Sequence, residues 1–227
     1  MGETPPDVPR RATNRRLGLK MLMIDHLVFA TPDLERGVSE IEALTGVCAS
    51  PGGRHPAWGT HNCLAALGAE TYLEIIAPDP AQPEPAAPRP FGLDGLPGSR
   101  LASWGVRGDH LERLVRAAAG NGVRLGELLS GSRIRSDGVV LAWELTSPPT
   151  SIEAGLIPFF IDWGSSPHPA GSAASGLSLV GLRAEHPEPA GVARSLAALG
   201  ADLPVLRASE PALVAVLDSP RGRVELR

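Results

Sequence analysis

The chain is poor in several residue types that mark whole classes of protein. Aromatic residues make up only 4% of its 227 residues, and there are two cysteines, Cys48 and Cys63. Two cysteines cannot form a disulfide framework or a four-cysteine zinc site, so we interpret them as reduced thiols. No apolar run reaches the roughly 18 residues that a membrane-spanning helix needs. A disulfide-stapled scaffold and a helical membrane protein are therefore both disfavoured.

The net charge and the short sequence motifs exclude further classes of function. The formal net charge is −4, which argues against a nucleic-acid-binding protein, because such a protein needs a basic face. The sequence contains no GxGxxG, GxxxxGK[ST], HExxH or GxSxG motif, so Rossmann, P-loop, zinc-protease and α/β-hydrolase chemistries lose support. A basic segment precedes Met21–Ala30, but Asp25 and His26 interrupt that apolar stretch, unlike a signal peptide. We expect a cytoplasmic protein, and the use of arginine over lysine is typical of a GC-rich bacterial genome.

A unit of strand, helix and further strands recurs along the chain. The strand candidate Met23–Ala30 precedes a helical stripe of Leu34, Val38, Ile41 and Leu44, which Gly46 ends. Similar patterns begin near residues 101 and 179. We therefore predict an α+β fold of repeated βαβββ modules with curved sheets around a cavity. The predicted organisation is a disordered tail at 1–22, a module at 23–77, a Pro-rich linker at 78–100, a middle module at 101–163, a flexible linker at 164–176 and a third module at 177–227.

The period-two alternation of strands points to two residues with metal-binding chemistry. If Leu27 and Leu73 face the helices, then His26 and Glu74 face the cavity from neighbouring strands. An imidazole and a carboxylate are common ligands of divalent metals. The alternative interpretation is a core histidine bonded to a backbone carbonyl and a glutamate in a salt bridge at a strand end.

The segments "IDHLVFATPDLERGVSEIEALTG" and "GGRHPAWGTHNCLAALGAETYLEIIAPD" resemble the vicinal-oxygen-chelate superfamily, and within it the glyoxalase-like domain proteins. "LIPFFIDWG" and "LDSPRGRVELR" extend the likeness. The resemblance implies paired βαβββ modules that hold a divalent metal, with ligands from the first and last strands of each module. It makes His26 and Glu74 metal ligands. The ion implied is zinc, iron, manganese or nickel, although the incomplete ligand set leaves a metal-free protein open.

The third module offers one more carboxylate in the same pattern. Glu225 in "VEL" matches Glu74 in "LEI", while Gly181 stands where His26 does. We therefore favour a pairing of the first and third modules, with Glu225 as a third ligand or the proton-abstracting base. The rival arrangement pairs the first and middle modules.

Other polar and aromatic residues are candidates for substrate contacts. A guanidinium binds a carboxylate bidentately, which makes Arg133 a candidate. The full set predicted to bind substrate is His55, His61, Asn62, Arg133 and Trp143. By contrast, we predict that His110, His168 and His186 are surface residues.

Two functions follow from these expectations. The first is a metal-dependent isomerase, lyase or dioxygenase that acts on a small oxygenated substrate. The second is a binding protein that sequesters a small molecule without chemistry. In both, the partner is a small molecule rather than nucleic acid or a membrane, and a homodimer is left open.

Overall fold

The computed structural model describes residues 23–135, 138–151 and 155–227. The tail predicted at 1–22 lies outside the described residues. Cys48 and Cys63 are both free thiols. The elements, in chain order, are β1 (Ile24–Ala30), α1 (Leu34–Thr45), β2 (Ser50–His55), β3 (Thr60–Ala66), β4 (Tyr72–Pro78), η1 (Pro90–Gly92), β5 (Arg100–Arg107), α2 (Leu111–Gly120), β6 (Leu128–Ile134), β7 (Val140–Thr146), β8 (Phe159–Asp162), η2 (Pro169–Ser172), β9 (Ser178–His186), α4 (Pro189–Leu199), β10 (Val205–Arg207), β11 (Ala212–Ser219) and β12 (Gly222–Leu226).

The first two modules share one topology and one sheet. Eight strands run in the order β2-β3-β4-β1-β5-β8-β7-β6. In each half, the first strand pairs in parallel with the last strand of its own module, β1 with β4 and β5 with β8. The two first strands then pair with each other, antiparallel, at the centre of the sheet. The pairing of first and third modules favoured from the sequence is therefore wrong, and the rival pairing of first and middle modules is correct.

The helix of the first module begins and ends at signals that can be read in the sequence. Asp33 is the N-cap of α1 and accepts a hydrogen bond from the Arg36 N–H at 2.8 Å. Gly46 ends the helix in the left-handed conformation with φ of 78°, which a residue without a Cβ adopts at little cost. Ile41, on the buried side of the helix, is fully buried against the sheet.

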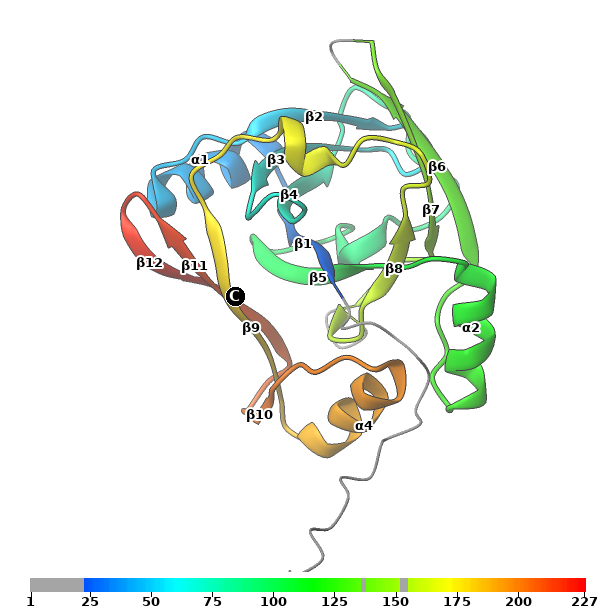
Figure 1. Cartoon of the computed structure of the whole chain (residues 1–227). Coiled ribbons are helices and arrows are strands. Elements are labelled where there is room, and N and C mark those ends of the chain that lie inside the picture. Colours follow the sequence, from blue (N-terminus) through cyan, green and yellow to red (C-terminus); the bar gives the residue numbers. More distant parts are fainter. Residues whose placement is uncertain (1–22, 136–137, 152–154) are drawn as a thin grey trace, which may run out of the picture.

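The eight-stranded sheet curls until its two edges approach each other, so that it is nearly a barrel (Figure 1). The edge strands β2 and β6 meet across this seam, where Arg133 of β6 donates to the carbonyl of Gly52 on β2. Part of the interior is filled by apolar side chains, among them Phe91, Leu93 and Leu96 from the Pro-rich segment between the modules. The remaining interior space is the pocket described below.

The third segment does not repeat the topology of the first two. Its four strands are ordered β10-β9-β11-β12, so its first strand β9 lies between β10 and β11. In a true repeat, β9 would pair with the last strand β12, but β12 is instead an edge strand next to β11. The resemblance of "VEL" to "LEI" therefore does not carry a structural equivalence.

The four-stranded sheet covers the outside of the barrel. Apolar residues of the third segment, including Leu213, Leu217 and Leu226, share one core with Leu27 of β1 and Trp104 of β5. The Leu101 N–H also donates to the carbonyl of Arg227 at 2.9 Å. The central strands β1 and β5 are therefore covered on their outer face by the second sheet, while their inner face lines the interior.

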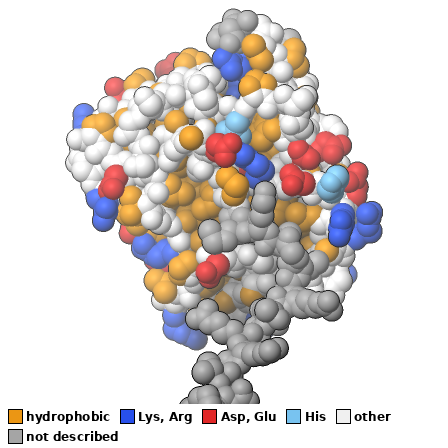
Figure 2. All heavy atoms as spheres, viewed as in Figure 1, with side chains coloured by type: hydrophobic (Ala, Val, Ile, Leu, Met, Phe, Trp, Pro, Cys, Tyr) orange, Lys and Arg blue, Asp and Glu red, His pale blue; other side chains and the backbone are white. Residues whose placement is uncertain are grey.

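On the face drawn in Figure 2, acidic and basic side chains are interspersed rather than gathered by sign. Among the helices that the structure describes, none is both long and apolar enough to span a membrane.

Candidate functional site

A narrow pocket opens from the interior of the near-barrel. Both modules contribute to its wall, and the lining is mainly aromatic with a few polar groups. Such a composition is usual for small-molecule sites. The lining residues are His26, His55, Trp58, Asn62, Tyr72, Glu74, Phe91, Arg133, Trp143, Leu145, Pro148, Phe159, Ile161 and Trp163.

The pocket brings His26 and Glu74 together. Leu27 and Leu73 face the helices and the outer core, so the alternate residues of β1 and β4 face inward. His26 Nε2 lies 3.8 Å from Glu74 Oε2, and both residues are buried. The strand phase predicted for these two residues is therefore correct. The imidazole is also packed on both sides, because Tyr72 stacks on it at 4.7 Å between ring centroids and Phe159 meets it edge-on at 5.2 Å.

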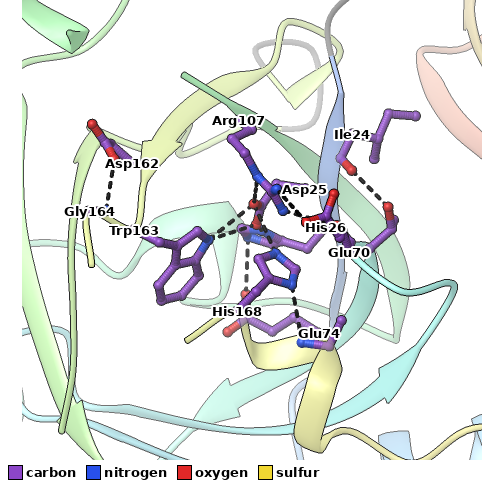
Figure 3. Close-up of polar contacts among 12 residues, drawn as sticks. Ile24, Asp25, His26, Glu70, Glu74, Arg107, Asp162, Trp163, Gly164 and His168 are labelled. Atoms are coloured by element: carbon purple, nitrogen blue, oxygen red, sulfur yellow. Dashed lines mark hydrogen bonds and ion pairs between the residues drawn. The ribbon is translucent and has the colours of Figure 1, made fainter. Parts of the chain in front are cut away.

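Behind His26, the carboxylate of Asp25 gathers polar contacts from several segments, as Figure 3 shows. Its oxygens lie 2.7 Å from His26 Nδ1, 3.1 Å from His168 Nε2, 3.1 Å from Trp163 Nε1 and 3.4 Å from Arg107 Nε. A register shift between Ile24 and His26 in the pairing of β1 with β5 marks an irregularity at Asp25. Such irregularities redirect side chains, which explains how the consecutive residues Asp25 and His26 can contact each other.

The contacts of Asp25 fix its charge. Burial by itself would raise the pKa of this carboxyl, but hydrogen bonds from His168 and His26, together with the charges of both rings, hold it well below its usual range. Asp25 is also fully buried, so this anion is shielded from solvent. A carboxylate accepts hydrogen bonds only, so it holds the proton of His26 on Nδ1. The other ring nitrogen, Nε2, is left facing Glu74 and the pocket.

A second chain of polar groups holds Glu74. The Asn62 amide donates to Glu74 Oε1 at 2.5 Å and lies 3.5 Å from His55 Nε2. His55 Nδ1 in turn lies 3.0 Å from the Thr60 hydroxyl. Burial lowers the pKa of His55, an effect that the charge of Glu74 partly opposes, so this imidazole is neutral at pH 7. Glu74 therefore keeps one oxygen engaged by Asn62 and presents the other toward His26.

The remaining candidates divide between the pocket and the surface. Arg133 and Trp143 line the pocket from the middle module, together with Asn62 and His55 from the first. His61 does not, because it lies on the opposite face of β3 from Asn62 and lines outer surface grooves. The structure thus brings four of the five residues predicted to bind substrate into one pocket.

The structure does not place Glu225 in the pocket. Its side chain is half-exposed on the edge strand β12, and both carboxylate oxygens lie 3.0 Å from Arg183 Nη2. The expectation that it joins His26 and Glu74 was wrong because it relied on a repeat that the third segment does not continue. Its carboxylate belongs to a network of ion pairs with Arg183 that also includes Glu185.

Several residues of the site escaped the sequence analysis. His168 was expected at the surface, yet its side chain is mostly buried and binds Asp25. Trp163, which donates to the same carboxylate, lies 138 positions further along the chain, and no local signal links the two. Strict alternation along β1 would put Asp25 on the same face as Leu27, and the strand irregularity breaks that alternation. Only the apolar character of Trp163 and its place at a strand end offered a hint.

The donor set does not complete a metal site. Among residues 23–135, 138–151 and 155–227, no group of three or more His, Cys, Asp or Glu side chains is arranged to hold a metal ion. His26 and Glu74 supply two donors, whereas structural zinc sites have four protein ligands and catalytic ones usually three. The middle module has Gly105 beside His26 and Phe159 against the same ring. The residues present therefore do not fit the metal centre that the resemblance implies.

Comparison with known proteins identifies the family to which this fold belongs. Residues 24–200 match the family of the glyoxalase-like domain. The chain belongs to this family. The vicinal-oxygen-chelate assignment and the α+β fold of curved sheets are thereby confirmed.

Solved structures share the fold of this glyoxalase-like domain protein. A hypothetical protein from Staphylococcus aureus superposes with a TM-score of 0.62 and 13% identity, over 85% of this chain and 88% of that one. Methylmalonyl-CoA epimerase from Mycobacterium tuberculosis gives a TM-score of 0.41 and 18% identity, over 64% of this chain and 91% of that one. No curated protein matches the chain. At 13% identity the likeness to the Staphylococcus aureus protein shows the fold alone, so the function has to be argued from the pocket.

Proposed function

We propose that this glyoxalase-like protein is an enzyme of the isomerase or lyase type that moves a proton on a small oxygenated substrate. The observation that carries the proposal is the pairing of His26 Nε2 with Glu74 Oε2, 3.8 Å apart in a buried pocket. Each of the two groups is held from behind, His26 by Asp25 and Glu74 by Asn62. Two prearranged groups that exchange protons are what acid–base catalysis needs.

The roles of the two groups follow from their contacts. The Glu74 carboxylate takes a proton from a carbon next to a carbonyl. The electron pair of the broken C–H bond forms a C=C bond, while the π pair of the carbonyl moves onto its oxygen. His26, with its Nδ1 proton held by Asp25, faces that oxygen with Nε2 and supplies a proton there when protonated. Return of the proton to a different atom or face gives an isomer, and loss of a leaving group instead gives a lyase product. The aromatic walls exclude water, which strengthens these electrostatic contacts.

Solvent-exchange measurements test this proposal. The full chain is incubated in D₂O with a panel of 2-oxo acids and α-hydroxy carbonyl compounds, and loss of the C–H signal is followed by ¹H NMR. We expect Glu74→Gln and His26→Gln to slow exchange about 10²- to 10⁴-fold, the usual contribution of general acid–base groups. Exchange that persists in Glu74→Gln would show that another group takes the proton.

Metal dependence is a separate prediction of the family resemblance and needs its own measurement. Metal content of the purified protein is determined alongside His26→Ala and Glu74→Ala. Stoichiometric metal that disappears in both variants would show that the two side chains are ligands, and the proton-transfer roles given above would then be wrong.

The aromatic wall favours a second candidate, a protein that binds a small molecule without chemistry. Six aromatic residues other than histidine line the pocket, namely Trp58, Tyr72, Phe91, Trp143, Phe159 and Trp163. Flat apolar walls give affinity without any need for acid–base groups. Tight ligand binding that is unchanged in His26→Gln, with no exchange of any substrate, would support this second function.

A further inference from the structure

A buried positive charge faces the pocket, where Glu74 attracts it electrostatically but makes no direct ion pair with it among the described residues. Arg133 is only 7% exposed, and its Nη1 donates to the backbone carbonyl of Gly52. Among the residues that the structure describes, no ion pair joins Arg133 to a carboxylate. Two other arginines that are partly shielded from solvent do form ion pairs. Arg89 pairs with Glu84 and Asp94, and Arg107 pairs with Asp25. A buried charge is costly unless it is paired, so the unpaired guanidinium points to an anion from outside the chain.

The strands around Arg133 are built to admit it. Arg133 extends from β6 across the seam of the near-barrel to β2, where two glycines stand side by side. A Cβ on Gly53 would lie 3.0 Å from Arg133 Cδ, and a Cβ on Gly52 would lie 2.1 Å from Asn62 Oδ1. Side chains at these positions would displace both pocket residues, so the glycines make room for the guanidinium and for the amide that holds Glu74.

Beside Arg133 the pocket wall is aromatic. Trp143 lies against Gly131, where a Cβ would be only 2.5 Å from the indole Cε2, so the ring packs directly over the backbone of β6. Trp163 lies 5.4 Å from Trp143 between ring centroids, and His55 lies 6.2 Å away. An unsaturated, planar ligand fits such walls better than a tetrahedral one, because flat groups stack on aromatic rings.

We propose that the pocket takes a small carboxylate, with its anionic end on Arg133 and a flat unsaturated body against Trp143. This names the substrate class of the proposed function and rests on the same pocket. Arg133 and Glu74 give the substrate a direction, since the carboxylate is drawn to Arg133 and repelled by Glu74. The reacting carbon is thereby turned toward Glu74 and His26. A planar carboxylate of single charge also matches the single charge of one guanidinium.

Calorimetric titration of the full chain with three simple probes tests the assignment. Benzoate is flat and anionic, benzamide is its neutral isostere, and phenyl phosphate carries the larger anion. We expect benzoate to bind most tightly, and Arg133→Met to weaken it about 10- to 100-fold, as for loss of a charged hydrogen-bonded pair. Arg133→Lys should give an intermediate loss, because the charge stays but the bidentate fork is removed.

Matched controls separate this inference from the proposed function. Arg36→Met, at an exposed arginine of α1, should leave benzoate binding unchanged. Benzoate binding and proton exchange are measured separately, so the inference fails on the titration and the proposed function fails on the exchange measurement. Equal binding of benzoate by Arg133→Met and the unaltered chain would overturn the inference, as would benzamide or phenyl phosphate binding as tightly as benzoate. Absence of benzoate binding at millimolar concentration would also overturn it.

Discussion

The eight-stranded and four-stranded sheets are built from similar runs of sequence, yet they use their polar faces in opposite ways. In the first, the inward face of β1 and β4 buries His26 and Glu74 in a pocket. In the second, the corresponding pattern on β9 and β12 puts Arg183 and Glu225 in an ion pair at the surface. Strand order decides the difference, because β4 lies next to β1 whereas β12 is separated from β9 by β11. A glutamate in the same local motif is therefore a candidate catalytic group in one sheet and a surface residue in the other.

The difference between the two glutamates is tested most directly by making the same substitution at both. Glu74→Gln should slow proton exchange about 10²- to 10⁴-fold. Glu225→Gln should leave exchange unchanged and alter the free energy of unfolding by less than about 1 kcal/mol, as is usual for an exposed ion pair. Equal loss of exchange in both variants would mean that the third segment contributes to the site after all.

The two sheets also differ in how deeply they bury an aspartate with cationic partners. Asp25→Asn removes the buried anion among His26, His168 and Arg107, and we expect a loss of about 3–5 kcal/mol in unfolding free energy. Asp218→Asn, which breaks an exposed pair with Arg223 on the second sheet, is the matched control and should leave the free energy of unfolding nearly unchanged. Urea unfolding measures both, and similar small losses would show that the Asp25 network is not integral to the fold.

The contact between the sheets can be tested through their shared core. Leu217 of β11 is fully buried in the cluster that also contains Leu27 and Trp104. Leu217→Ala should lower the free energy of unfolding by about 2–5 kcal/mol, with a single cooperative transition, because both sheets rest on that core. Leu206→Ala, at an exposed leucine of β10, is the control. Two separate transitions in the Leu217 variant would show that the sheets unfold independently.

The smallest expected effect concerns a buried histidine. Burial lowers the pKa of His55 in the folded protein, although Glu74 opposes the shift. Above the ordinary histidine pKa of about 6.5, both folded and unfolded chains hold it neutral. Below that value the unfolded chain binds a proton that the folded chain resists, so stability falls as the pH falls.

His55→Gln should remove this part of the acid sensitivity. Between pH 7.5 and about pH 5.5 we expect the unaltered chain to lose up to about 1 kcal/mol more unfolding free energy than the variant does. His186→Gln, on β9 of the second sheet, is the matched control and should keep the full acid sensitivity. An identical pH dependence in the His55 variant would contradict the buried, neutral state of that ring.

Local patterns in the sequence determined the individual elements and their faces. The apolar stripe and the terminating Gly46 located α1, and period-two alternation turned His26 and Glu74 inward, because backbone geometry sets which side chains share a face. Asn62 and Arg133 were predicted as substrate contacts from the two modules, but the sequence did not show that they share one pocket. Family resemblance then supplied the fold of paired modules.

Only the tertiary structure decided which strands pair and which distant groups meet. The sequence pattern of a βαβββ unit is the same whether its last strand pairs with its first strand or lies at a sheet edge. The sequence therefore could not reveal that the third segment departs from the repeat. Asp25, Trp163 and His168 meet through long-range packing between segments up to 143 positions apart, and no local propensity encodes such a meeting. The environment of Arg133 is likewise a property of the assembled pocket, since the sequence does not show which groups surround its guanidinium.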